Sequence, residues 1–194
     1  YIQDVNSDRS FNNIDRYFVR GQALLENENI SFRIIGDFAK TDESCCGALN
    51  TGSGFVLGGG GAAASAVVEA LAGANGLDGI VLPFNASARR MAASPNRDLS
   101  EKVEEFGISG QLDWELGDVT LTSITAYRDW QATRNQDIDF SGLDRAYRDG
   151  YETGIQDFTQ EIRLKGTAFN DKLDWMVGGF YLNEKNTLTD RVRF

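Results

Sequence analysis

Two adjacent cysteines, Cys45 and Cys46, are the first residues in the chain with a capacity for chemistry. Thiols outside the cytoplasm are usually oxidised, so the pair could form a vicinal disulfide, stay free, or bond to regions elsewhere. Two thiolates are too few to close a metal site, and the chain contains no histidine to complete one. We therefore predict a possible disulfide at Cys45 and Cys46, with no metal site and no cofactor.

A glycine-rich run over residues 55–64 has the spacing of a dinucleotide-binding loop. Gly59, Gly61 and Ala64 fit G-x-G-x-x-A, and Asp78 follows about 20 residues after the start of the run. However, Asp78 precedes the next apolar run instead of ending it, and no βαβ series follows. We interpret the run as a Gly/Ala-rich loop, with a short helix predicted over 62–74.

An acidic and aromatic segment later in the chain could help to hold Ca²⁺ or a substrate. Its spacing does not match an EF-hand loop, so a solvated loop is the simpler interpretation. No carboxylate pair has a sequence context that would raise a pKa, and a Ser–His–Asp set is impossible without histidine, so we predict no enzyme. The candidate residues of the segment are Asp137, Asp139, Asp144, Tyr147, Asp149 and Tyr151.

The elements that carry these residues are predicted to be long antiparallel strands. Residues 104–116 alternate strictly between apolar and polar side chains, as a strand with two different faces does. A tight turn at Gly117 and Asp118 leads into residues 119–131, and pairing Leu116 with Val119 brings the two apolar faces together. Further strands are predicted near 14–26, 30–43, 155–165 and 172–185, with long loops over 44–103 and 132–154. A turn over 26–29 that pairs Glu26 with Asn29 is predicted to join the first two of these strands, with Tyr17 opposite Phe38.

The lengths of these strands and loops favour a membrane protein. Strands of about 11–15 residues exceed the soluble mode of about 5–6, whereas transmembrane strands need about 9–11. Outer-membrane barrels also combine short turns on one side with long loops on the other. A soluble β-sandwich with one solvated face is the alternative that alternation alone leaves open. The fold class is therefore predicted as all-β, with antiparallel transmembrane β-barrel strands and long extracellular loops.

Aromatic side chains at two levels of the predicted strands are typical of the girdles of such a barrel. Charged and polar side chains on the opposite faces would be costly in lipid but natural beside a wet lumen. The predicted lipid-facing girdle comprises Tyr17, Phe38, Trp114, Tyr127, Trp175 and Tyr181. The predicted lumen-facing residues are Arg20, Arg33, Asp37, Gln111, Asp113, Arg128, Glu161 and Arg163.

Several strand phrases resemble the barrel of TonB-dependent outer-membrane receptors of Gram-negative bacteria. They include VRGQALLE (19–26), TLTSITAYRDW (120–130), FTQEIRLKG (158–166) and KLDWMVGGFYLNE (172–184). The resemblance implies that residues 1–194 are part of one barrel domain, contributing six strands of about 22 that enclose a plug. It also implies a location in the cell outer membrane and energised uptake of a scarce nutrient such as a ferric siderophore.

The partners implied by the resemblance are the lipid bilayer of the outer membrane, TonB, the plug domain of the same receptor and a small nutrient ligand. A formal net charge of −10 argues against nucleic acid as a partner. The alternatives are a small plug-less porin or adhesin barrel, in which residues 187–194 would form a seventh strand, and a soluble β-rich binding protein or NAD-type enzyme. Ile124 and Trp130 fall on the polar side, which either a bulge between 122 and 126 or contact with a plug would explain.

Overall fold

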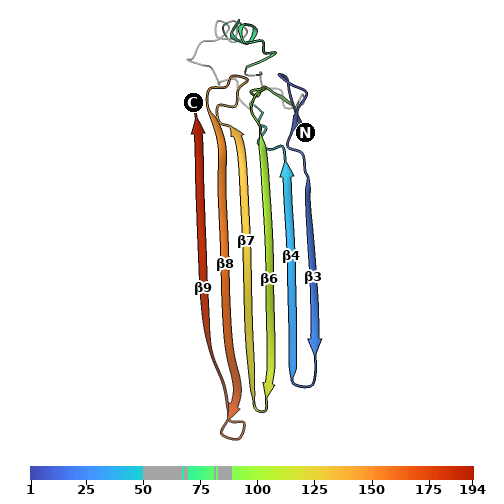
Figure 1. The fold of residues 1–194 in the computed structure, drawn as a ribbon, viewed down its shortest axis with the longest axis vertical. Helices are drawn as coiled ribbons and strands as arrows, with labels where there is room; N and C mark the ends of the chain where they lie inside the picture. Colours follow the sequence, from blue (N-terminus) through green and yellow to red (C-terminus); the bar gives the residue numbers. More distant parts are fainter. Residues whose placement is uncertain (50–66, 68–69, 81, 83–88) are drawn as a thin grey trace.

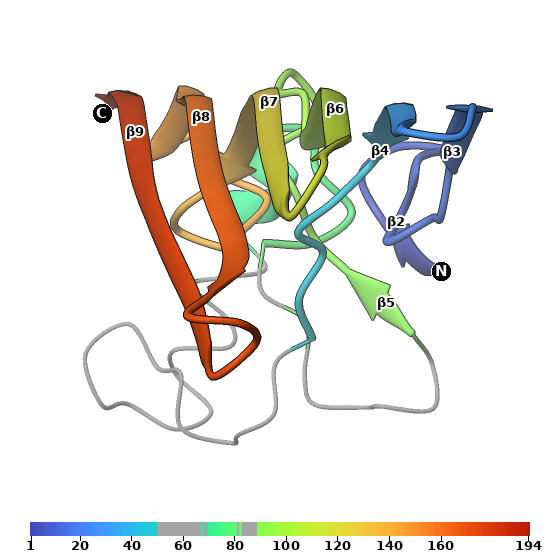
Figure 2. The same ribbon diagram turned by 90° about the horizontal axis from the view of Figure 1, so that it is seen from below.

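The computed structural model describes residues 1–49, 67, 70–80, 82 and 89–194. Most of this chain is one sheet of six antiparallel strands in the order β3-β4-β6-β7-β8-β9. The strands lie side by side in a single row, with β3 and β9 as the two edges (Figures 1 and 2). The described residues therefore form an open sheet and not a closed barrel. The strands are β3 (Arg16–Glu26), β4 (Ile30–Glu43), β6 (Ser100–Leu116), β7 (Val119–Asp137), β8 (Tyr147–Ala168) and β9 (Leu173–Arg193).

A small cap lies at the end of the sheet opposite the short turns (Figure 1). Its strands β1 (Ile2–Asp4), β2 (Ser10–Phe11) and β5 (Arg90–Met91) form a second sheet in the order β2-β1-β5. The side chains of Phe11, Met91, Ala93 and Leu99 are buried together, with Ile2 packed against them. The cap thus has a hydrophobic core of its own, although its strands are only two or three residues long.

The β6–β7 hairpin has the register that the alternation predicts. Leu116 pairs with Val119, and Trp114 pairs with Leu121. Gly117 adopts a positive φ of 70°, a conformation that glycine reaches without the steric penalty of a Cβ atom. The predicted turn and the coincidence of the two apolar faces are confirmed.

The β3–β4 hairpin is shifted by two residues from the predicted register. Pairing Glu26 with Asn29 would place Tyr17 opposite Phe38, but Glu26 pairs with Ser31 and Tyr17 with Lys40. The Asn27 side chain accepts hydrogen bonds from the backbone N–H groups of Asn29 and Ile30, which centres the turn on residues 28–29. A shift of two preserves the faces of a strand, so the predicted sides remain correct.

Three other predictions need correction. The loop predicted over 132–154 covers only 138–146, because β7 and β8 both extend into it. Residues 187–194 do not form a seventh strand, because β9 continues through Arg193. No register shift interrupts β7 between 122 and 126; the irregularity against β8 lies at residues 134–135.

In the helix predicted over 62–74, the described residues 67 and 70–74 are helical, and the others lie outside the described residues.

Candidate functional site

The first candidate surface is the apolar face of the sheet, defined as the side that carries Trp114. Every one of the six strands places apolar residues on this side, including Val19, Ile34, Ile108 and Val177. These four residues remain 38–62% exposed, because the sheet is a single layer and no other described element packs on this face. The face therefore lacks the second layer that covers such a surface in a soluble sheet protein.

Each of the six strands contributes one aromatic residue to a row across the apolar face. Phe38 pairs directly with Phe106, and Tyr127 pairs directly with Phe158. Ring centroids lie 5.9 Å apart between Tyr17 and Phe38 and 6.3 Å apart between Phe158 and Tyr181. Phe106 and Phe158 were not predicted as girdle residues, since only the register shows that they are level with the others. The complete row is Tyr17, Phe38, Phe106, Tyr127, Phe158 and Tyr181.

This aromatic row runs obliquely to the strands. Three of its five steps move two residues toward the short turns, as where Phe106 pairs with Asp129 instead of Tyr127. The row thus descends about 20 Å along the strands while crossing about 24 Å of sheet, so it is inclined by about 40° to the perpendicular to the strands. The short turns descend in the same direction, from β3–β4 to β8–β9 (Figure 1). Trp114 and Trp175 lie nearer the turns, on the same face.

The second candidate surface is the polar face, defined as the side that carries Asp113. All eight residues predicted to face a lumen lie on this side of the sheet: Arg20, Arg33, Asp37, Gln111, Asp113, Arg128, Glu161 and Arg163. A chain of hydrogen bonds crosses three strands, from Arg33 Nη2 to Gln111 Oε1 (2.8 Å) and from Gln111 Nε2 to Asp113 Oδ2 (2.7 Å). The Thr122 hydroxyl donates to Asp113 Oδ1 at 2.6 Å, so each of these polar side chains has a hydrogen-bond partner in the next one.

A second cluster on the polar face centres on Arg128. Its guanidinium contacts both Glu105 and Asp37, and the Asp37 side chain is only 10% exposed. Gly107 pairs with both Asp37 and Arg128 and leaves the space between them open. A Cβ atom at Gly107 would lie 2.9 Å from Arg128 Nη2 and 2.9 Å from Asp37 Oδ1. The glycine therefore lets an ion pair form across the width of one strand; Glu105 and Gly107 were not anticipated as part of this cluster.

The polar face becomes apolar at both edges of the sheet. Phe18 and Leu24 on β3 and Met176, Phe180 and Leu182 on β9 are 52–68% exposed. Ile124 and Trp130 also remain on the polar face, in unbroken register. Charged networks thus occupy the middle of this face, whereas the edges expose apolar side chains.

The acidic residues of the predicted 132–154 loop do not come together as a metal site. No group of three or more candidate ligands forms among the described residues. Asp139 instead accepts backbone N–H bonds from Ser141, Arg145 and Ala146, and Asp144 pairs with Arg97. The Tyr147 hydroxyl donates to Asp98 O, while Asp149 pairs with Arg193 and Arg148 lies over the Tyr151 ring. These contacts hold the 138–146 loop and the adjoining ends of β8 and β9 instead of forming a metal site.

Asp137 corrects the prediction that no carboxylate has a raised pKa. Burial raises the pKa of Asp137 to about 7, and the nearby charge of Asp139 adds to this shift. Backbone N–H groups of Asp139 and Phe140 donate to Oδ1 and oppose it, whereas Oδ2 is buried without a hydrogen-bond partner. The buried surroundings of the Asp137 carboxyl form only when β7 and the 138–146 loop fold together, so the sequence context did not reveal them.

The remaining predicted sites are structural or lie outside the described residues. Cys45 and Cys46 form a vicinal disulfide with an S–S distance of 2.02 Å. Asp78 is exposed, and Gly59, Gly61 and Ala64 lie outside the described residues. In the described part of the chain, no helix is both long and apolar enough to cross a membrane.

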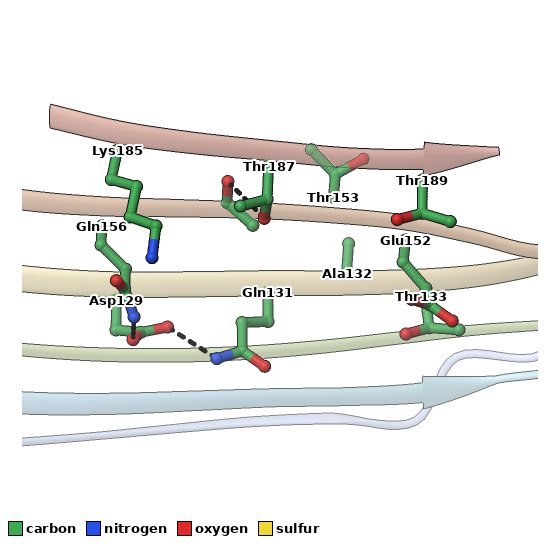
Figure 3. A pocket seen from close by; sticks show the side chains of 11 residues that line it. Asp129, Gln131, Ala132, Thr133, Glu152, Thr153, Gln156, Lys185, Thr187 and Thr189 are labelled. Carbon is green, nitrogen blue, oxygen red and sulfur yellow. Dashed lines mark hydrogen bonds between the residues drawn. The ribbon is translucent and has the colours of Figure 1, made fainter.

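An additional groove lies on the apolar side of the sheet, beyond the aromatic row and toward the cap. It has a volume of about 310 Å³ and polar walls contributed by β7, β8 and β9 (Figure 3).

No family model, curated protein or solved structure matches this chain.

Proposed function

We propose that this chain forms part of the wall of a transmembrane β-barrel in the outer membrane of a Gram-negative bacterium. The observation that carries the proposal is the apolar face, which is bounded by an aromatic row and covered by no described element. Soluble monomers rarely expose so large a contiguous apolar surface, because its hydration is unfavourable. Lipid against this face would remove that cost.

The inclination and height of the apolar face support the same proposal. Strands of outer-membrane barrels tilt by about 35–45° from the membrane normal. If the aromatic row lies in the membrane plane, its inclination of about 40° from the perpendicular to the strands gives these strands a tilt of about 40°. On β6 the apolar residues run from Phe106 to Leu116. Ten residues at that tilt span about 25 Å along the membrane normal, the height of the apolar band in such barrels.

The polar face and the two edges also fit a larger closed wall. The ion pairs around Arg128 and the chain from Arg33 to Thr122 would lie against a wet lumen. Unpaired strand edges are not stable in lipid, so β3 and β9 would pair with further strands. The apolar side chains exposed near both edges of the polar face, such as Phe18 and Phe180, would contact a plug domain.

The specific function that we propose is TonB-energised uptake of a scarce nutrient such as a ferric siderophore. It rests on the resemblance of the strand phrases to TonB-dependent receptors, with TonB as the energising partner. A strain that makes the receptor but lacks TonB should lose uptake of the nutrient. Steady ion conductance through the purified protein without TonB would instead identify a plug-less pore.

Two neighbouring isoleucines give a matched test of the membrane placement. Ile34 lies midway along the apolar face and Ile35 lies on the polar face of the same strand. In the intact protein made by the cell, Ile34→Arg should cost about 2–4 kcal/mol of stability in the membrane, whereas Ile35→Arg should be tolerated. The measurements are the amount of protein in the outer-membrane fraction and its heat-dependent mobility in gels.

Equal effects of the two substitutions would contradict the proposed orientation. Recovery of the intact protein as a monomer in aqueous buffer, with Ile34→Arg harmless, would indicate a soluble β-rich binding protein instead.

A further inference from the structure

The polar groove is built as a regular array around one glycine. Above Tyr127 and Phe158, strands β7, β8 and β9 place three residues level with one another on each of three successive rows. Gly154 is the middle residue of the middle row, and the eight residues around it are polar. The rows are Asp129, Gln156 and Lys185; Gln131, Gly154 and Thr187; and Thr133, Glu152 and Thr189.

The missing side chain of Gly154 creates the depression. A Cβ atom there would lie only 2.8 Å from Thr187 Oγ1. Figure 3 shows the polar side chains that β7, β8 and β9 contribute to the groove. With a volume of about 310 Å³, the groove is at the lower end of the range for small-ligand sites, and suits one or two small rings.

The polar groups in the groove offer both donors and acceptors. Asp129 accepts from Gln156 Nε2 at 2.7 Å and from Gln131 Nε2 at 3.0 Å. Glu152 pairs with Arg191, and Lys185 makes no ion pair with any described residue. The negative charges of Asp129 and Glu152 are balanced by the positive charges of Lys185 and Arg191. The array therefore suits a neutral ligand rich in hydroxyl groups, each of which can donate and accept a hydrogen bond.

The position of the groove identifies the source of that ligand. In the proposed orientation, its rows lie two to six residues beyond the Tyr127–Phe158 pair, or about 5–15 Å above the aromatic row at a tilt of about 40°. The polar zone of an ordinary phospholipid leaflet is only about 5–8 Å deep. A lipid with a saccharide headgroup could reach the groove while its acyl chains lie along the aromatic row.

We propose that this groove binds the sugar headgroup of a glycolipid in the outer leaflet that surrounds the protein. The inference rests on the proposed membrane placement and adds a specific lipid site to it. A glycolipid and a free sugar both carry a pyranose ring with free hydroxyls. Only the glycolipid adds acyl chains, which make apolar contacts that a free sugar lacks.

The test uses the intact protein in phosphatidylcholine vesicles that contain diglucosyl diacylglycerol as the probe. Retained lipid is identified by native mass spectrometry after transfer to detergent. We expect the glycolipid to be retained at least tenfold over phosphatidylcholine. Gly154→Leu fills the groove and should remove this preference, while Gly179→Leu, on the same face with no atom within 4 Å of its Cβ position, should preserve it.

A second variant tests the inference independently, in case Gly154→Leu fails to fold. Lys185→Met leaves the backbone and Gly154 unchanged and should weaken glycolipid retention by roughly threefold to tenfold. Equal retention of both lipids by the wild-type protein, or an unchanged preference in both variants, would overturn the inference. Binding of free maltose as tightly as the glycolipid would also overturn it, because the ligand would then be a soluble sugar.

Failure of this inference is distinguishable from failure of the membrane placement. A protein that enters vesicles with normal yield and shows heat-dependent gel mobility, but does not prefer the glycolipid, contradicts only the lipid site. A protein that does not enter vesicles contradicts the membrane placement itself.

Discussion

The cap and the six-stranded sheet stabilise their side chains in different ways. In the cap, Phe11 and Ala93 are at most 1% exposed, and the Asp4 side chain is fully buried among hydrogen-bond donors. In the sheet, every residue of β3 is exposed, and apolar side chains across the other strands remain open on one face. The cap is therefore folded against itself, whereas the sheet requires a surrounding medium or partner to complete it.

This difference shows that burial within one chain is a poor guide to the environment of a strand. The cap strands are short but enclosed, as expected for a segment that meets water. The sheet strands are long and exposed on the apolar face, as expected when the solvent for that face is lipid.

The largest expected effect is in the cap, at Asp4. Its carboxylate accepts from Arg9 Nη2 at 2.9 Å, Ser7 Oγ at 2.6 Å and the backbone N–H of Ala93 at 3.0 Å. Asp4→Ala should destabilise the cap by about 3–5 kcal/mol, because it removes the partner of a partly buried arginine and of several donors. Hydrogen exchange should show faster exchange at Val5 and Ala93 but no change in β6–β8.

Asp8→Ala is the matched control for Asp4, because Asp8 is exposed in the same segment. Its exchange rates should equal those of the wild-type protein. Loss of protection throughout the sheet in Asp4→Ala would show that the two regions fold as one unit, contrary to the comparison.

A smaller effect is expected on the polar face of the sheet, at Gly107. Gly107→Val should displace Arg128 from Asp37 and cost about 1–3 kcal/mol, because Asp37 would keep little contact with water. Gly21→Val, on the apolar face where no atom lies within 4 Å of the Cβ position, should be neutral. The free energy of unfolding of the intact protein from vesicles measures both.

A double-mutant cycle identifies the cause of the Gly107 effect. In an Arg128→Met background, Gly107→Val should cost much less than in the wild-type protein. An unchanged cost in that background would show that the valine acts through the backbone and not through the ion pair.

The smallest expected effect is the pH dependence of the loop at 138–146. The pKa of Asp137, at the end of β7 nearest the cap and ten residues beyond Tyr127, is raised to about 7 from an unfolded value of about 3.9. A raised pKa means that the folded loop binds the proton more tightly, so the resulting stability is full below about pH 4 and is lost as pH rises through about 7.

Hydrogen exchange at Phe140, compared between wild type and Asp137→Asn, measures this dependence. Between about pH 5 and pH 8, protection of Phe140 should fall by roughly tenfold or more in the wild-type protein relative to the variant, which cannot ionise. Parallel pH profiles for the two proteins would rule out Asp137 as the titrating group.

Much of the sheet could be predicted from the sequence because strand alternation is a local property. Side chains i and i+2 share a face in any extended strand, so Ile108 and Trp114 were assigned to one side without knowledge of their neighbours. The turn at Gly117 was equally local. The predicted pairing of β3 with β4 was wrong because the Asn27 side chain accepts hydrogen bonds that centre the turn on residues 28–29. The alternation of apolar and polar residues carries no information about such a hydrogen bond.

The pattern of residue types was enough to show that the chain is rich in long two-faced strands, and which side chains each face carries. The folded sheet was needed to show which residues are level with one another on different strands, because register depends on turn geometry and cross-strand pairing. That alignment brings Phe106 and Phe158 into the aromatic row and inclines it to the strands. It also surrounds Gly154 with polar side chains and buries Asp137 beneath its loop.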